Sequence, residues 1–122
     1  MRKFGLLILL VVSSMAFNAR MASADMQAEI NHLLNYVENS QCTFIRNGSD
    51  HSGPDAKEHI VKKYNYFKDR IHSAEQFIEY SATQSTMSGK KYKVVCDGKE
   101  YLTAHWLNDE LKNYRKNMGA SN

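Results

Sequence analysis

The 122-residue sequence lacks a local pattern that would assign it to a defined class of enzyme or metalloprotein. Its five histidines include no pair four residues apart, and no Cys-x-x-Cys is present, so a zinc site is not indicated. Gly89-Lys90 is not part of a phosphate-binding loop, because the earlier glycine is missing and Lys91 stands where a serine or threonine is needed. Internal repeats and low-complexity tracts are absent as well. We therefore expect one domain and no cofactor.

No apolar run in the sequence reaches the length of about 20 residues that a membrane span requires. The run from Phe4 to Val12 follows Arg2 and Lys3, and Ala22-Ser23-Ala24 offers the small-x-small pattern that signal peptidase cleaves. These features predict a signal peptide over residues 1–24 and a single domain over residues 25–122, without a membrane span after cleavage. The predicted location is the periplasm or the medium outside the cell.

An excess of charge of one sign is also missing once the predicted signal peptide is removed. The whole chain has 16 basic and 13 acidic residues. Arg2, Lys3 and Arg20 precede residue 25, whereas no acidic residue does, so the remaining chain carries 13 of each sign. This balance argues against nucleic acid as a partner.

Only two cysteines, Cys42 and Cys96, are present. An exported chain folds under oxidising conditions, and two cysteines there predict one disulfide bond. Closing a loop of this length contributes about 4 kcal/mol to stability in the chain-entropy model. A free thiol that acts as a nucleophile beside a histidine is the alternative.

Hydrophobic periodicity predicts a mostly helical chain. Apolar residues recur at helical spacing over about residues 26–39, 54–71 and 74–82, and again after Thr103, whose side chain could cap the last helix. A period of two around Val94, followed by Asp97-Gly98, predicts a β-hairpin. Residues 42–45 form a short extended segment that leads into a turn at Asn47-Gly48. The expected fold is α+β, with about four helices and one β-hairpin tied by a single disulfide.

The order of these segments resembles a family of small exported proteobacterial proteins that is defined only as a domain of unknown function. The resemblance implies an exported, periplasmic protein of one compact domain, and it implies no activity or cofactor. The chain departs from the family pattern at Gln84, where an arginine is common, which weakens any function that needs a cation there. The residues that carry the resemblance are Glu29, Leu33-Leu34, Val37, Ser40, Cys42, Phe44, Arg46-Asn47-Gly48, His59, Lys63-Tyr64, Glu75, Phe77-Ile78, Ser85, Ser88-Gly89-Lys90, Tyr92, Cys96 and Trp106-Leu107.

The candidate binding residues combine cations with hydroxyl donors from a turn, a helix face and a serine-rich loop. Such a cluster could bind a carboxylate or a phosphate. It predicts a non-catalytic binding or accessory protein whose partner is an unknown protein or an anionic cell-envelope ligand. A solvated helix face, with its cations paired to neighbouring acidic residues, is the alternative. The candidates are Arg46, His59, Lys63, Ser85, Ser88 and Lys90.

Two further functions remain open for the loop from Ser85 to Tyr92. Ser88 and Lys91 have the Ser-x-x-Lys spacing of penicillin-recognising acyl enzymes, in which the lysine activates the serine. That interpretation would make the protein a small cell-envelope hydrolase. Ser88-Gly89-Lys90-Lys91-Tyr92 also matches the Ser-Gly-x-x-Tyr string of periplasmic lysozyme inhibitors, in which a loop delivers hydroxyl and amine donors into an acidic cleft.

Overall fold

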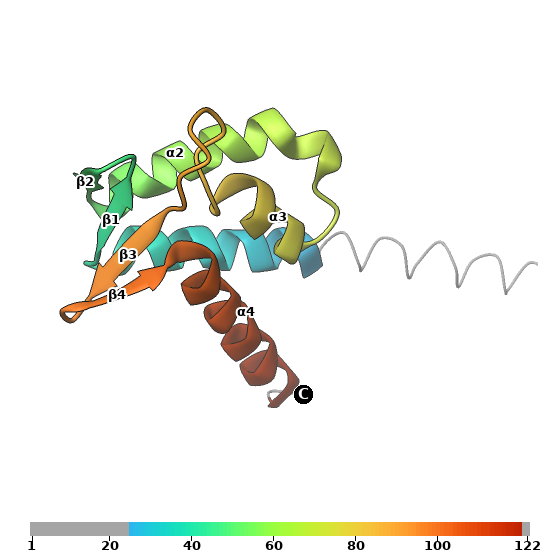
Figure 1. The fold of residues 1–122 in the computed structure, drawn as a ribbon. Coiled ribbons are helices and arrows are strands. Elements are labelled where there is room, and N and C mark those ends of the chain that lie inside the picture. The colour runs from blue at the N-terminus through green and yellow to red at the C-terminus, as the bar shows by residue number, and fades with distance from the viewer. Residues whose placement is uncertain (1–24, 121–122) are drawn as a thin grey trace, which may run out of the picture.

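The computed structural model describes residues 25–120, so the predicted signal peptide, residues 1–24, lies outside the described part of the chain. The described chain is helical over residues 25–39 and then forms the elements labelled in Figure 1. They are β1 (Thr43–Arg46), β2 (Ser49–His51), α2 (Gly53–Phe67), a 3-10 turn (Lys68–Arg70), α3 (Ala74–Ser81), β3 (Lys93–Cys96), β4 (Lys99–Leu102) and α4 (Thr103–Ala120). The fold is therefore α+β and mostly helical, as predicted. None of the described helices has the length and apolar character needed to cross a membrane.

The four strands form one antiparallel sheet in the order β2-β1-β3-β4. The β3–β4 hairpin is the predicted one, and the structure adds a second hairpin, β1–β2. Both hairpins turn through two residues with positive φ: Asn47 (51°) and Gly48 (79°) in one, Asp97 (51°) and Gly98 (77°) in the other. Positive φ at both positions matches the right-handed twist of the flanking strands.

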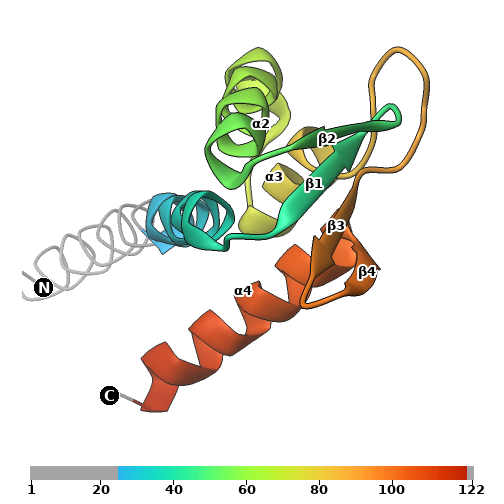
Figure 2. The same ribbon diagram turned by 90° about the vertical axis from the view of Figure 1, so that its left-hand side faces the viewer.

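The hydrophobic core lies between one face of the sheet and the helices. In Figure 2 the N-terminal helix, α2 and α3 lie on one side of the sheet, and α4 runs below them from the end of β4. The sheet contributes Phe44 and Val94, which are opposite each other in the β1–β3 register. The helices and their connections contribute Ile30, Leu33, Val37, Ala56, Ile60, Tyr64, Ile71, Ala74, Phe77, Ile78, Ala82, Leu107 and Leu111.

Two of the helix starts follow the expected side-chain chemistry. Ser52 accepts a hydrogen bond from the Asp55 amide at 3.3 Å, and Ser73 accepts one from the Gln76 amide at 3.1 Å. These bonds satisfy amide donors that have no partner within the helix. The predicted cap at Thr103 is wrong, because β4 runs directly into α4 and the Thr103 side chain is buried without a hydrogen-bond partner.

Helix α2 ends at Phe67, four residues before the predicted end at Ile71. The chain tightens into the 3-10 turn, and Ile71 then adopts an extended conformation, with φ −99° and ψ 111°. The Ile71 side chain is nevertheless buried, with 4% of its surface exposed. Its apolar character therefore reflects a core contact at the turn towards α3 and not a continuation of the helix.

Helix α2 begins in close contact with the end of the N-terminal helix. A Cβ atom added to Gly53 would lie 2.6 Å from the Val37 carbonyl oxygen and 2.8 Å from that of Glu38. Real Cβ atoms do not approach backbone oxygens so closely, so only glycine fits there. This contact fixes the start of α2 and thereby the positions of His59 and Lys63 further along the helix.

Candidate functional site

The β1–β3 pair has a disulfide at one end and a polar cluster at the other. Thr43 pairs with Val95 and Ile45 with Lys93, so Cys42 lies next to Cys96, and Arg46 lies next to Tyr92. Side chains two residues apart on a strand point to the same face. Arg46 and Tyr92 therefore project from the sheet face that carries Phe44, towards α2.

Tyr92 joins two side chains of α2. Its hydroxyl lies 3.2 Å from Nε2 of His59 and accepts a hydrogen bond from Nζ of Lys63, also at 3.2 Å. The Lys63 ammonium additionally lies 5.0 Å from the centre of the Tyr92 ring, a distance typical of a cation–π contact. Since Lys63 donates to the hydroxyl oxygen, the hydroxyl hydrogen is free to reach an unprotonated His59 nitrogen. We call Arg46, His59, Lys63 and Tyr92 the cationic cluster.

The cationic cluster disfavours further positive charge. Burial lowers the pKa of His59 to about 4, and the neighbouring charges of Arg46 and Lys63 add to the effect. Burial, followed by the charge of Arg46, also lowers the pKa of Lys63. Burial raises the pKa of Tyr92, although Arg46 opposes that shift. His59 is therefore neutral at pH 7, and its ring accepts a proton far less readily than a solvated histidine does.

No carboxylate neutralises the cationic cluster within the part of the chain that the structure describes. None of the ion pairs among residues 25–120 involves Arg46, His59 or Lys63. This differs from the solvated helix face considered above, in which each cation would have an acidic neighbour. Lys62, one residue away on α2, shows that alternative arrangement, because its ammonium lies 3.8 Å from Glu58.

The two predicted serines belong to a loop that is bonded to the β1–β2 turn. Ser85 is buried, and its hydroxyl oxygen accepts hydrogen bonds from the Ser88 amide at 3.2 Å and from the Asn47 side-chain amide at 3.4 Å. The Ser88 hydroxyl donates to the Asn47 side-chain oxygen at 2.6 Å. The sequence identified Asn47 only as a turn former and missed its role in holding this loop.

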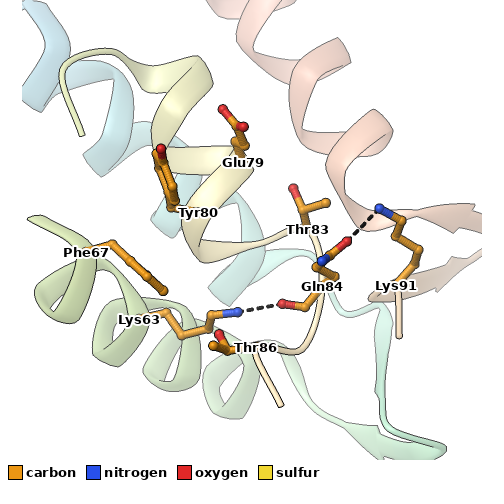
Figure 3. Close-up of a pocket in the computed structure, with 8 residues that line it drawn as sticks. All are labelled: Lys63, Phe67, Glu79, Tyr80, Thr83, Gln84, Thr86 and Lys91. Carbon is orange, nitrogen blue, oxygen red and sulfur yellow. Dashed lines mark hydrogen bonds between the residues drawn. The ribbon is translucent and has the colours of Figure 1, made fainter. Parts of the chain in front are cut away.

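Gln84 connects the loop to the cationic cluster. Its backbone oxygen accepts a hydrogen bond from Nζ of Lys63 at 2.6 Å, and its side-chain oxygen accepts one from Nζ of Lys91 at 2.7 Å (Figure 3). Beside these contacts lies a surface hollow of about 430 Å³, with the stacked rings of Phe67 and Tyr80 in its wall. Gln84, which stands where an arginine is common in the family that the sequence resembles, thus supplies a separate acceptor to each of two lysines.

The structure brings Arg46, His59 and Lys63 together, but it places Lys90 elsewhere. Lys90 is exposed and lines a different hollow, of about 440 Å³, together with Ile45 and Lys93. Ile45 and Lys93 project from the outer face of the sheet, opposite the cationic cluster. The predicted binding residues therefore fall into two groups, one on each side of the sheet edge.

The Ser88 and Lys91 side chains that the hydrolase alternative requires are bonded to other groups. Ser88 donates to Asn47, and Lys91 donates to Gln84. Among the described residues, no hydrogen bond joins Ser88 to Lys91. An activated serine needs its base within about 3 Å, so this arrangement lends the hydrolase alternative no support.

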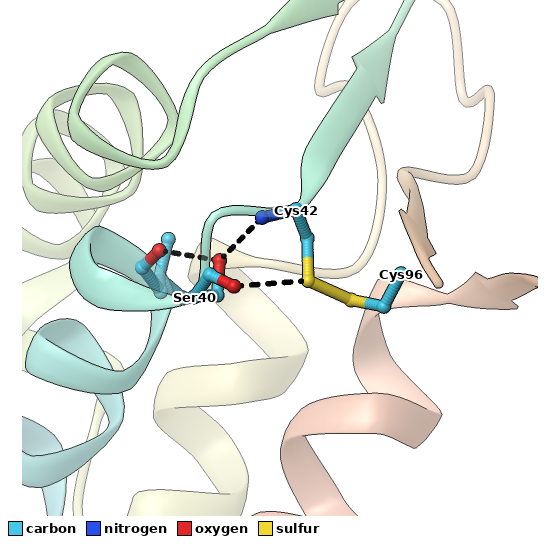
Figure 4. Close-up of a disulfide and its surroundings, with 4 residues drawn as sticks. Ser40, Cys42 and Cys96 are labelled. Carbon is cyan, nitrogen blue, oxygen red and sulfur yellow. Dashed lines mark hydrogen bonds between the residues drawn. A yellow bond between two sulfur atoms is a disulfide. The ribbon is translucent and has the colours of Figure 1, made fainter. Parts of the chain in front are cut away.

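The far end of the β1–β3 pair carries the predicted disulfide. Cys42 and Cys96 are bonded with an S–S distance of 2.01 Å and a Cα–Cα distance of 4.8 Å (Figure 4). The Cys42 amide donates to the Ser40 hydroxyl at 3.2 Å, which links the bridge to the end of the N-terminal helix. No free cysteine is present among the described residues, so the alternative of a nucleophilic thiol is set aside.

Comparison with known proteins gives a family but no activity. The model of a family of unknown function, DUF5329, matches residues 24–115. The chain is also 38% identical over 71 residues to the uncharacterized protein YfeK of Salmonella typhimurium (strain LT2), an alignment that covers 57% of this chain and 59% of that protein. No solved structure matches the chain.

Proposed function

Because the chain belongs to the family of unknown function DUF5329, we propose its function from the site itself: it is a non-catalytic binding protein that holds an anionic group of its ligand at the cationic cluster. The ligand group is a carboxylate or a phosphate, the two anions that guanidinium and ammonium groups bind with charge-assisted hydrogen bonds. The proposed source of that group is a component of the cell envelope.

The observation that carries this proposal is the uncompensated charge of the cluster. Arg46 is close enough to Lys63 and His59 to repel positive charge on both, since its charge lowers the pKa values of both side chains. Such repulsion between the cations lowers the stability of the folded protein, and an anion bound between Arg46 and Lys63 would remove the repulsion. Neutral His59, which keeps one N–H donor, can then supply a further hydrogen bond to the same group.

The proposed location is the periplasm or the extracellular medium. The Cys42–Cys96 disulfide supports an oxidising compartment, because such bonds rarely persist in a reducing cytosol. Export by the predicted signal peptide is part of the proposal. Catalysis is not part of it, since the hydroxyl and amine groups of the loop hold one another in place through Asn47 and Gln84.

The experiment that tests the proposal is thermal unfolding of the purified protein with phosphate and citrate as probes. A ligand at about ten times its dissociation constant stabilises the folded state by about 1.4 kcal/mol, which should raise the melting temperature of a domain of this size by several degrees. Added sodium chloride should weaken the shift, because salt screens the charges.

The matched variants are Arg46→Gln, which removes a cluster cation, and Lys112→Gln, which removes an exposed cation of α4. We expect the first to abolish the shift and the second to preserve it. Equal shifts in both variants, or none in the unmodified protein, would show that the cluster binds no anion.

A further inference from the structure

The loop between α3 and β3 projects from the molecule together with the β1–β2 turn. Figures 1 and 2 both show this loop extending beyond the sheet, and Figure 2 shows the tip of the β1–β2 hairpin beside it. The Asn47 side chain bonds to Ser85 and Ser88, so the two segments form one unit. We call residues 47–48 and 85–91 the projecting edge.

Internal hydrogen bonds hold the projecting edge in one conformation. The Ser85 amide donates to the Lys90 carbonyl oxygen at 2.9 Å, and the Gly89 amide donates to the Ser85 carbonyl oxygen at 2.9 Å. The Ser88 hydroxyl oxygen accepts from the Lys90 amide at 3.2 Å. Gly89 has a φ of +74°, a conformation that other residues adopt only with strain. Such a loop loses little conformational entropy when it binds a partner.

The side chains at the tip of the projecting edge are available to a partner. Met87 is 98% exposed, and Thr86, Ser88 and Lys90 are exposed as well. Methionine is a flexible apolar residue that adapts to the shape of a binding surface. An exposed, hydrogen-bonded loop with an apolar tip has the features of a segment that enters a cavity on another protein.

The charge of the projecting edge selects the kind of cavity. Between Glu79 and Asp97 the chain contains no acidic residue, but it contains Lys90, Lys91 and Lys93. Lys90 has no acidic partner among the described residues, and Lys91 is bonded only to the neutral Gln84 side chain. The lysines complement carboxylates, to which they can donate charge-assisted hydrogen bonds.

We propose that the projecting edge inserts into the catalytic cleft of a glycoside hydrolase whose active site contains paired carboxylates. Met87 enters first, and Lys90 and Lys91 approach the two carboxylates. The insertion blocks the cleft and involves no covalent step. Peptidoglycan-cleaving lysozymes have clefts of this chemistry, since their reaction uses two carboxyl groups.

A membrane surface is a less suitable partner for the same loop. Met87 is the single large apolar side chain of the tip, and its neighbours Thr86, Ser88 and Gly89 would bring hydroxyls and backbone polar groups into lipid. Those groups lose hydrogen bonds with water there and gain none. In a protein cleft they meet polar partners.

The inference goes beyond the proposed anion-binding function and can fail independently of it. The inserted side chains belong to the projecting edge, whereas the anion is held by Arg46 and Lys63 on the other side of the sheet edge. Lys63 also holds the Gln84 backbone, so its replacement would disturb both surfaces. Arg46→Gln therefore reports on the anion, and Lys90→Glu reports on the insertion.

The test measures inhibition and binding of a panel of peptidoglycan-cleaving glycoside hydrolases with two-carboxylate clefts, including a chicken-type lysozyme. We expect stoichiometric inhibition of at least one enzyme, and a chitooligosaccharide that fills its cleft should displace the protein. Lys90→Glu should weaken binding at least tenfold, because it places a negative charge beside carboxylates. Gly89→Val should weaken it as well, since it forces the tip out of its positive-φ conformation.

The matched control is Lys112→Glu, which makes the same charge change on α4 and should leave inhibition unchanged. All three variants should keep their far-ultraviolet circular dichroism. The inference is overturned if no enzyme of the panel is inhibited, or if Lys90→Glu and Lys112→Glu have equal effects. It is also overturned if the unmodified protein instead binds vesicles of anionic lipid in a manner that depends on Met87 and Lys90.

Discussion

His59 should make the stability of the protein depend on pH between pH 6.5 and about 4. Burial and the nearby cations lower its pKa from 6.5 to about 4 in the folded state. As the pH falls below 6.5, the unfolded chain takes up a proton at this position, whereas the folded protein does not until the pH approaches 4. The free energy of unfolding therefore falls between these values, and the contribution of His59 to it is fully present only above pH 6.5.

The magnitude follows from the two pKa values. Without screening, the linkage relation gives a loss of about 2 kcal/mol between about pH 7.5 and about pH 5. The His59 ring is half-buried, and solvent around it reduces the effect, so we expect about 1 kcal/mol. A difference of this size is measurable by urea unfolding.

The assay compares unfolding at the two pH values for the unmodified protein and for His59→Gln. Glutamine cannot be protonated, and its side-chain oxygen can still accept a hydrogen bond from Tyr92. We expect the variant to lose about 1 kcal/mol less stability on acidification than the unmodified protein. His72→Gln, at an exposed histidine before α3, serves as the control and should behave like the unmodified protein. If His59→Gln shows the same pH dependence as both, the electrostatic description of the cluster is wrong.

Three further predictions concern stability, and urea unfolding measures each of them. Replacing Cys42 and Cys96 together by alanine should cost about 4 kcal/mol in the chain-entropy model, and reductant should then have no further effect. Arg115→Gln should cost about 1 to 2 kcal/mol, less in high salt, because the guanidinium makes four hydrogen bonds of 2.6–2.9 Å to two carboxylates but is partly exposed. The contact with Arg115 lowers the pKa of Glu75, one of the two carboxylates. The stabilisation from this ion pair is therefore present above the ordinary glutamate pKa of 4.5 and should be lost as the pH falls below 4.5. Gly53→Ala should cost about 1 to 3 kcal/mol through its clash with backbone oxygens, whereas Gly119→Ala, with no atom nearby, should not destabilise the protein.

The helices could be predicted because their sequence pattern and their packing agree. Ile30, Leu33 and Val37 recur at helical spacing, and all three are buried in the core. Ser52 and Ser73 cap α2 and α3. The pattern gave the wrong end for α2, because Ile71 fits the helical period of that helix but reaches the core from an extended segment.

The β1–β2 hairpin could not be recognised from local sequence alone. Strand β2 has three residues, Ser49–His51, and all of them are polar, so it shows no apolar alternation. Asn47-Gly48 predicts a turn, as Asp97-Gly98 does, but the residues after it do not predict a second strand. An edge strand this short is formed mainly by its hydrogen bonds to β1, which a propensity argument does not include.

The cationic cluster was predictable in part, and the predicted disulfide could have identified its missing member, Tyr92. The sequence placed His59 and Lys63 on one helix face, but it gave no reason to add Tyr92. In an antiparallel pair, a bridge between Cys42 and Cys96 brings Phe44 opposite Val94, as the register shows. Continuing the same pairing by two residues brings Arg46 next to Tyr92. Combining the predicted disulfide with antiparallel pairing would therefore have identified Tyr92 as the neighbour of Arg46.

The same register argument gives the disulfide a role in the site as well as in stability. A slip of one residue between β1 and β3 would turn every side chain of the slipped strand to the other face. Arg46 would then leave Tyr92 and project to the outer face of the sheet, where Ile45 and Lys93 now lie. A covalent bond between Cys42 and Cys96 is incompatible with that slip, because it fixes these two residues side by side. The disulfide at one end of the strand pair thus preserves the cationic cluster at the other end. This role is separate from its contribution to the stability of the protein.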